Sequence, residues 1–168
     1  MTYIRSEVPA DHEAVRWVNE HAFGRPDEAL LVSALRERAR PVISLVAEIQ
    51  ERVVGHIMFS PGSLSGHGDS DVMVLAPMAV APARQGGGLG SLLVREGLAE
   101  CGRLGVGAVV VLGHADFYPR FGFVPASDYG LSCAYEVPAE AFMAVELRAG
   151  YLSGRPGTVR FHPAFDDL

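Results

Sequence analysis

Four glycines fall within the five residues from Gly86 to Gly90, directly after an apolar segment and directly before a Leu-rich one. Glycine costs backbone entropy and packs no side chain, so such a cluster indicates that bare backbone is required there. The first amides of a helix have no partner within the helix, and the helix dipole is positive at that end. A strand, a glycine turn and a helix start together predict a site for a phosphate-like anion. A turn without any ligand is the alternative, which one or two glycines would favour.

The spacing of the glycines distinguishes between known kinds of phosphate loop. A P-loop requires Lys directly after its last glycine, and Gly90 is followed by Ser91 instead. The dinucleotide pattern G-x-G-x-x-G fails because Ser91 takes the third glycine position. The hydrolase pattern G-x-S-x-G is absent as well. The pattern that fits is Gln85-x-x-Gly88-x-Gly90.

This loop resembles the pyrophosphate loop, Q/R-x-x-G-x-G/A, of the GNAT N-acetyltransferase superfamily. A second motif follows at the right separation, because Phe117–Phe123, FYPRFGF, is similar to the family's F-Y-x-x-x-G-F segment. The two motifs cover about Leu75 to Phe123. The residues of the second motif and those of the tail Gly157–Phe165 are most similar to the YhbS-like branch of the superfamily.

The resemblance implies an N-acetyltransferase whose donor is acetyl-CoA or another acyl-CoA. The glycine turn would hold the pyrophosphate, and the bulged strand before it would pair with the pantetheine arm through Met78 and Val80. A backbone amide near Met78 would polarise the thioester carbonyl and hold the developing oxyanion. Arg84 would reach a phosphate, although a solvated surface arginine is equally compatible. The donor-binding residues implied in this way are Met78, Ala79, Val80, Arg84, Gln85, Gly86, Gly87, Gly88, Leu89, Gly90, Ser91, Phe117, Tyr118 and Arg120.

Two residues are candidates for moving protons. Tyr118 takes the position of the family's tyrosine that protonates the departing thiolate, and a phenol with a pKa of about 10 can donate to a thiolate whose thiol has a pKa of about 8.5. A core tyrosine within a phenylalanine cluster is the alternative. His114 follows the buried strand Ala108–Leu112 at its C-terminal end, where ligands bind in open α/β sheets, and its ordinary pKa suits a general base. A loop histidine without a catalytic duty is equally compatible, and Glu48 and His56 are weaker candidates.

The chain departs from the family pattern just before Tyr118. Family members often have an Asn and a longer helix there, whereas only Gly113–Phe117 follows the buried strand in this chain. This helix is therefore expected to be short and to contribute little to holding the outer part of coenzyme A.

Alternation and periodicity predict the elements that position these residues. Strands are expected at Thr2–Glu7, Val42–Ile49, Val53–Ser60, Val72–Val80, Ala108–Leu112, Phe121–Pro125 and Phe142–Leu147, with a loop at Pro61–Ser70. Three helices are expected. The first follows Asp11 as its N-cap and has Trp17 on its apolar side, and the third covers Leu89–Leu104. The second, between them, turns these residues inward: Leu30, Leu31, Ala34 and Leu35. This order predicts an α/β (α+β) fold in one domain, residues 1–168, with a mixed, mostly antiparallel sheet and helices on both sides. The resemblance adds splayed strands at the acyl-CoA site.

Composition excludes several classes of partner. With 14 basic and 20 acidic residues the formal charge is −6, which argues against nucleic acid. The two cysteines form no CxxC, and no apolar run reaches membrane-spanning length, so a reduced, cytoplasmic protein without membrane contact is expected. His114 and Asp116 lack a third ligand at useful spacing, so no metal is expected.

The acceptor is the part that the sequence leaves open. A small-molecule amine, a protein N-terminus and a lysine are all compatible with the resemblance, and the acidic charge mildly favours a cationic amine. The first two helices, with Trp17, His21 and Phe23, the loop Pro61–Ser70 and the segment Ala126–Glu140 are expected to select it.

Two further expectations concern the tail and the class of protein. The tail Gly150–Leu168 is expected to pack near the pocket with His162 and Phe165 inward, and a homodimer through late strands is compatible with the resemblance. A non-catalytic acyl-CoA sensor or partner-binding module on the same fold is the competing hypothesis, because no residue is plainly the base.

Overall fold

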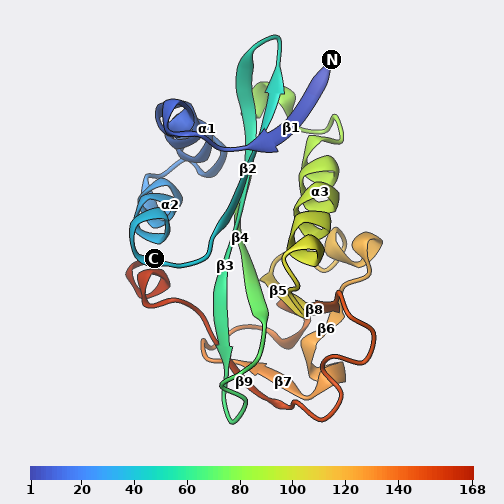
Figure 1. Ribbon diagram of the computed structural model, residues 1–168. Helices are drawn as coiled ribbons and strands as arrows, with labels where there is room; N and C mark the ends of the chain where they lie inside the picture. Colours follow the sequence, from blue (N-terminus) through green and yellow to red (C-terminus); the bar gives the residue numbers. More distant parts are fainter.

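The computed structural model describes residues 1–168 and is built around one nine-stranded sheet (Figure 1). The path of the sheet is β1-β2-β3-β4-β5-β8-β6, and β9 joins β7 to the end of β3. All pairs are antiparallel except β4 with β5 and β7 with β9. The strands are β1 Thr2–Ser6, β2 Ile43–Ile49, β3 Arg52–Leu64, β4 Val72–Val80, β5 Ala108–Leu112, β6 Val124–Pro125, β7 Leu131–Cys133, β8 Phe142–Glu146 and β9 Gly157–Arg160.

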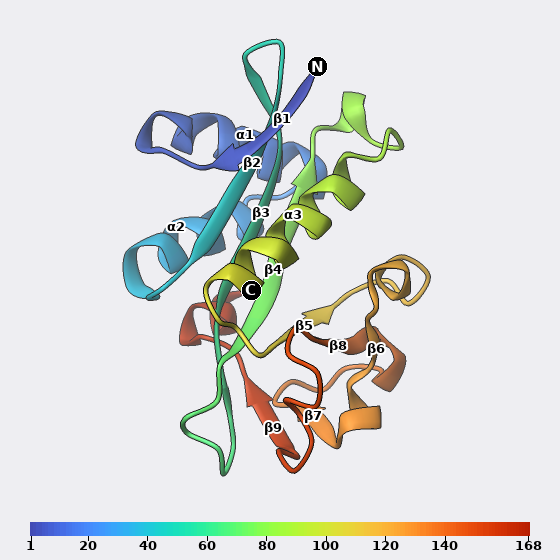
Figure 2. The same cartoon turned by 45° about the vertical axis from the view of Figure 1, so that its right-hand side comes forward.

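Three α-helices cover the two faces of the sheet (Figures 1 and 2). They are α1 His12–Phe23 and α2 Asp27–Arg38 on one face, and α3 Leu89–Arg103 on the other. Short 3-10 turns lie between the larger elements; those used below are η3 Tyr118–Phe121 and η6 Pro163–Asp167. The mixed, mostly antiparallel sheet with helices on both sides confirms the predicted fold class. None of the α-helices combines the length and the apolarity needed to cross a membrane.

Alternation along β3 explains how one sheet supports two cores. Met58 packs into the core under α1 and α2, whereas Ile57 and Phe59 pack into the core under α3. Gly97 of α3 allows the helix to lie close to the sheet, since a Cβ atom at this position would be 2.4 Å from the Phe59 ring. The position of α3 in turn fixes the glycine turn at its N-terminus.

Strands β4 and β5 separate partway along their length. They pair only from Val72 with Ala108 to Leu75 with Val111, and β4 then continues alone to Val80. Against β3, the register shifts between the pairs Phe59–Leu75 and Ile57–Met78, so β4 carries an extra residue there. The predicted splay between the strands is therefore present, with the bulge directly before Met78.

Two predictions for single elements are wrong, one because of a distant strand partner and one because of a local turn. The predicted loop Pro61–Ser70 begins later than expected: β3 runs to Leu64, since its last residues pair with β9, a strand formed by residues 157–160. The predicted strand Phe121–Pro125 shrinks to the two residues of β6, because Tyr118–Phe121 form η3. Neither β7 nor β9 was expected from the sequence.

The helices also differ from the predicted pattern at their surfaces. Leu30 is 66% exposed and Trp17 is 49% exposed, although both were expected to face inward. Trp17 instead stacks on His21, with ring centroids 3.9 Å apart. Asp11 is the N-cap residue of α1 by position, but its side chain makes no cap bond there and pairs with Arg5 at 2.7 Å.

A buried polar chain joins α1 to the sheet. His56 on β3 is fully buried, with its Nδ1 3.2 Å from Asn19 Nδ2 and its Nε2 2.8 Å from Ser44 Oγ. Ser44 Oγ donates to Glu7 Oε1 at 2.9 Å, and Glu7 pairs with Arg36 at 2.7 Å. All of these hydrogen bonds can form at once when His56 is neutral: Asn19 then donates to its Nδ1, and its Nε2–H group donates to Ser44. His56 therefore serves packing between α1 and the sheet.

This buried histidine predicts a loss of stability in mild acid. Burial lowers the pKa of His56 to about 4 from 6.5, so between these pH values the unfolded chain binds a proton that the native protein does not. The stability that neutral His56 contributes is fully present above its pKa in the unfolded chain, and it is lost as the pH falls toward its pKa in the folded protein. Between pH 7 and pH 5 the free energy of unfolding should fall by about 2 kcal/mol more in the parent protein than in His56→Gln. Urea unfolding of both proteins at the two pH values measures this difference, and equal falls would refute it.

Candidate active site

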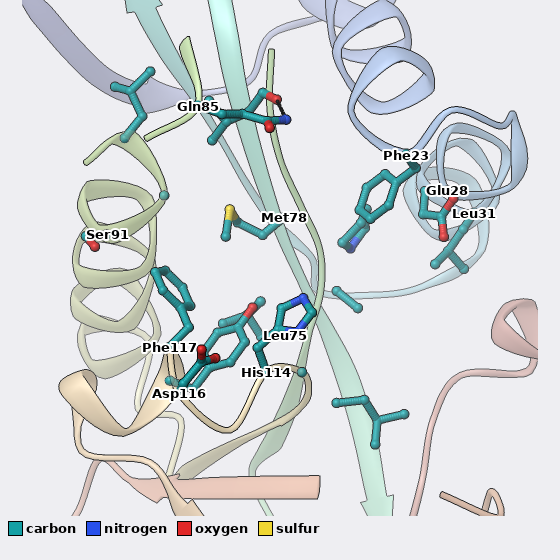
Figure 3. A pocket seen from close by; sticks show the side chains of 18 of the residues that line it. Phe23, Glu28, Leu31, Leu75, Met78, Gln85, Ser91, His114, Asp116 and Phe117 are labelled. Carbon is teal, nitrogen blue, oxygen red and sulfur yellow. Dashed lines mark hydrogen bonds between the residues drawn. The ribbon is translucent and has the colours of Figure 1, made fainter. Parts of the chain in front are cut away.

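A cavity of about 1180 Å³ lies where β4 and β5 separate. In Figure 3, Met78 of β4 lies between Ser91, Asp116 and Phe117 on one side and Phe23, Glu28 and Leu31 on the other. The cavity is lined by these sequence-predicted residues: Met78, Val80, Arg84, Gln85, Gly86, Gly88, Leu89, Gly90, Ser91, His114, Phe117, Tyr118 and Arg120. The structure therefore brings both sequence motifs to one site.

The glycine turn presents free backbone donors to this cavity. Gly86 and Gly88 have φ angles of +82° and +87°, in the left-handed region that favours glycine. Gly88 is the N-cap residue of α3, and no side chain caps the helix. The amides from Gly86 to Ser91 donate no hydrogen bond within the protein. Free donors at a helix N-terminus fit an anionic group.

The other residues of the turn hold it in place. Gln85 Nε2 donates to the Val80 carbonyl at 3.0 Å, which ties the turn back to the end of β4. Arg84 is exposed, lines the cavity and forms no ion pair, so its charge is available to a ligand. Gly87 is exposed beside the cavity without lining it. The geometry thus gives Gln85 a positioning role and leaves anion binding to the amides and Arg84.

The end of β4 offers an unpaired strand edge. From Ala76 to Val80 the side of β4 that faces β5 has no strand partner. Met78 and Val80 line the cavity, whereas alternation turns Ala79 to the opposite face, where it is buried and pairs in register with His56. The Ala79 side chain is therefore outside the cavity, and this residue is available to a ligand only through its backbone.

Tyr118 belongs both to the cavity and to an aromatic cluster. Its ring packs against Phe117 and Phe123, with centroids 5.0 and 5.5 Å apart. Gly113 makes room for it, since a Cβ atom there would be 2.3 Å from the Tyr118 ring. The Tyr118 hydroxyl has no hydrogen-bond partner within the protein, and burial raises the pKa of the phenol to about 12. The phenol therefore carries its proton throughout the neutral range, and the same burial makes it a weaker acid than a free phenol.

His114 is exposed within the cavity, and Figure 3 shows it between Phe117 on one side and Leu31 on the other. Its ring makes no hydrogen bond within the protein, so both ring nitrogens are free for a ligand. The weaker candidates lie elsewhere: Glu48 pairs with Arg5 at 3.0 Å, and His56 is part of the buried chain under α1. Of the three possible bases named from the sequence, only His114 reaches the cavity.

Arg120 adds a second positive group to the cavity, beside Phe117. Its guanidinium carbon is 4.9 Å from the centre of the Phe117 ring, and its Nη2 donates to the Asp116 carbonyl at 3.4 Å. Arg84 and Arg120 are the two arginines that line the cavity. No group of three His, Cys, Asp or Glu side chains could hold a metal ion.

The segments that form the far wall of the cavity were predicted from the sequence, but only some of its residues were. Phe23 and the segment Ala126–Glu140, through Tyr135 and Val137, do line it, and Phe165 is buried against it as expected. The other residues of this wall lie in the second helix and the tail, which were expected near the pocket, but they were not singled out from the sequence: Glu28, Leu31, Phe161, Asp166 and Leu168. They come together only because η6 packs against α2, which no local signal predicts.

Several residues expected at the acceptor site lie outside it. Trp17, His21 and the segment Pro61–Ser70 do not line the cavity. His162 does not point into it either, because its Nδ1 accepts a hydrogen bond from the Ala164 amide at 3.0 Å and caps η6. The cavity therefore gives no support to these residues as acceptor contacts.

Comparison with known proteins gives consistent matches over nearly the whole chain. A model of the acetyltransferase (GNAT) family matches residues 11–123. The uncharacterized N-acetyltransferase YjhQ of Escherichia coli is 44% identical over 157 residues, covering 91% of this chain and 86% of YjhQ. The uncharacterized N-acetyltransferase YhbS of Escherichia coli is 36% identical over 164 residues, covering 97% of this chain and 98% of YhbS.

Two solved structures with bound ligands have the same fold. The crystal structure of Escherichia coli YhbS in complex with CoA has a TM-score of 0.93 at 35% identity, covering 98% of this chain and 92% of that one. A GNAT family acetyltransferase from Brucella melitensis in complex with acetyl-CoA has a TM-score of 0.82 at 35% identity, covering 99% of both chains.

Proposed function

The chain belongs to the GNAT acetyltransferase family, and we propose that it moves the acetyl group of acetyl-CoA to a primary amine by direct attack within a ternary complex. One observation carries the proposal. A single cavity holds the free amides of the glycine turn, the unpaired edge of β4 and the hydroxyl of Tyr118. These are the three groups that a thioester donor with a pyrophosphate requires.

Acetyl-CoA fits the donor side of the cavity. The amides of Gly86–Ser91 and the guanidinium of Arg84 supply donors and positive charge for the pyrophosphate. The free edge of β4 offers backbone groups to the amides of the pantetheine arm, as an added strand would. Two structures similar to this chain are complexes with CoA and with acetyl-CoA, which supports acetyl-CoA as the co-substrate.

The reaction forms a bond from the amine nitrogen to the acetyl carbon and breaks the bond from that carbon to sulfur. In this proposal His114 accepts the proton that the nitrogen loses, and the backbone amide of Met78 stabilises the negative charge that develops on the carbonyl oxygen. Tyr118 donates its proton to the departing sulfur. The electron pair of the broken bond stays on sulfur, so no oxidant or reductant is needed.

Direct attack is favoured over a covalent acyl-enzyme because no cysteine lines the cavity. Cys101 is fully buried, and burial raises the pKa of its thiol to about 12. Cys133 lies on β7, and burial raises the pKa of its thiol as well. A thiol is a nucleophile only as the thiolate, so neither residue is placed or activated for acyl transfer.

We expect the purified protein to bind acetyl-CoA and to release free CoA only when an amine is added. Calorimetric titration measures the binding, thiol release measures turnover, and mass spectrometry identifies the acetylated amine. Intersecting initial-rate lines would support the ternary complex, whereas parallel lines would indicate an acyl-enzyme. The chain contains no lysine, so the enzyme adds no side-chain amine to the background. Binding without turnover on any amine would contradict the proposed activity and favour a sensor.

A further inference from the structure

The cavity has a second part whose chemistry differs from that of the donor side. Its apolar wall, called here the acceptor wall, consists of Phe23, Leu31, Val137, Phe161 and Phe165. These residues come from α1, α2, the segment after β7, and the tail around η6. Figure 3 shows Phe23 and Leu31 across Met78 from Ser91 and Phe117. An amine that reaches the thioester from this side must pass along an apolar surface.

The aromatic part of the acceptor wall is rigidly packed. The rings of Tyr135 and Phe161 lie edge to face with centroids 5.4 Å apart, and Phe161 and Phe165 lie edge to face at 5.2 Å. The Tyr135 hydroxyl donates to Asp166 Oδ1 at 2.7 Å, which ties the segment after β7 to η6. A preformed wall of this kind holds a flat, ring-sized group at low entropic cost.

The wall carries negative charge at its edge. Asp166 lines the cavity and is exposed, and its only side-chain partner is the neutral hydroxyl of Tyr135. Glu28 also lines the cavity, but its carboxylate is paired with Arg25. The two arginines of the cavity are Arg84 and Arg120, of the turn before α3 and of η3. Asp116 lies on the donor side as well, so two arginines and one carboxylate leave it positive, whereas the acceptor wall is negative.

We propose that the acceptor is a small primary amine on an apolar, ring-sized body, which packs on the acceptor wall while Asp166 favours the cationic amine. This inference rests on the proposed acetyl transfer and specifies its substrate class. A polyamine would need several unpaired carboxylates on the acceptor wall, and only Asp166 lies there, because Asp116 lies beside Phe117 on the other side of Met78. A lysine side chain presents a flexible aliphatic stem and would leave the aromatic wall largely uncovered.

A matched pair of amines tests the apolar body. We expect kcat/KM for 2-phenylethylamine to exceed that for ethylamine by about 10²-fold, because the two differ by a phenyl group whose burial is worth about that factor. Equal values for the pair, or a higher value for spermidine or a lysine peptide, would overturn the inference. Titration of 2-phenylethylamine into the CoA-saturated protein is independent of turnover. No binding there overturns the substrate class, whereas no binding of acetyl-CoA overturns the proposed function.

Variants at the wall and its edge assign the preference to named residues. Phe23 is 41% exposed at the end of α1, so Phe23→Ala should fold and should reduce the preference for 2-phenylethylamine over ethylamine about tenfold. Asp166→Asn keeps an acceptor for Tyr135 and removes the charge, so KM for the amine should rise about fivefold with kcat and acetyl-CoA binding unchanged. Asp167→Asn is the matched control, since Asp167 is exposed and outside the cavity. Equal KM values for Asp166→Asn and Asp167→Asn would refute the role of Asp166.

Discussion

Gly88→Glu should bind acetyl-CoA at least about 10³-fold more weakly than the parent protein. The substitution places a carboxylate where the amides of Gly86–Ser91 and the N-terminus of α3 converge. Each hydrogen bond from such a donor to a charged group is worth about 1.5–3 kcal/mol, and repulsion between two anions adds to the loss of two or more of them. A factor of 10³ corresponds to about 4 kcal/mol, which this loss readily exceeds. Calorimetric titration of both proteins measures the ratio.

The control for this variant must carry the same backbone strain and the same added charge. Gly66→Glu does so, because Gly66 has a φ angle of +78°, is exposed, and has no atom within 4 Å of the added Cβ position, as is also true of Gly88. Gly66 lies outside the cavity. Both variants should therefore lose similar stability in urea, while only Gly88→Glu loses the donor. If the two variants bind acetyl-CoA equally well, the glycine turn is not the phosphate site.

The donor side could be predicted from the sequence because its signals are local. The glycine turn, Gln85 and the start of α3 are contiguous, and their geometry depends on φ angles that glycine alone adopts easily. The helix N-terminus supplies its free amides whatever packs around it. Tyr118 could be placed at the cavity only through the resemblance, because its spacing alone is that of a core aromatic residue, which it also is.

The acceptor side could be predicted only by segment, and not by residue, because it is assembled from distant parts of the chain. Leu31 of α2 and Phe165 of η6 share the acceptor wall only after the tail has packed against the helices. The same long-range pairing extends β3 through Leu64, where the local sequence Pro61–Ser70 has turn-forming composition. Turn propensity loses to ladder hydrogen bonds when a partner strand is available, and the partner lies 93 residues or more along the chain.

The difference between the donor side and the acceptor wall of the cavity has a functional explanation. The donor is the same molecule for the whole proposed reaction class, and it is bound mainly by backbone groups that the glycines of the turn place. The acceptor wall is built from side chains of α1, α2 and the tail, so its chemistry can change without disturbing the glycine turn. This separation is why the sequence indicates the reaction, whereas only the packed structure indicates the class of amine.

Tyr118→Phe should lower kcat about 10²-fold and leave acetyl-CoA binding within about twofold of the parent. General acid catalysis contributes about 10²–10⁴-fold, and the lower end applies because a thiol with a pKa of about 8.5 is already a tolerable leaving group. The phenyl ring keeps the packing against Phe117, Phe123 and Gly113, and the lost hydroxyl had no partner within the protein. Thermal unfolding should therefore be nearly unchanged, which separates a catalytic role from a structural one.

The pH profile and a second tyrosine complete this test. Because burial raises the pKa of Tyr118 to about 12, its phenol remains protonated through the neutral and mildly alkaline range, and kcat should not fall there through ionisation of this residue. Tyr129→Phe is the matched control, since Tyr129 is partly buried, lies in the turn before β7 and does not line the cavity. A Tyr118→Phe enzyme with kcat within threefold of that of Tyr129→Phe would show that sulfur departs as the thiolate, and it would confine Tyr118 to the aromatic cluster beneath the donor.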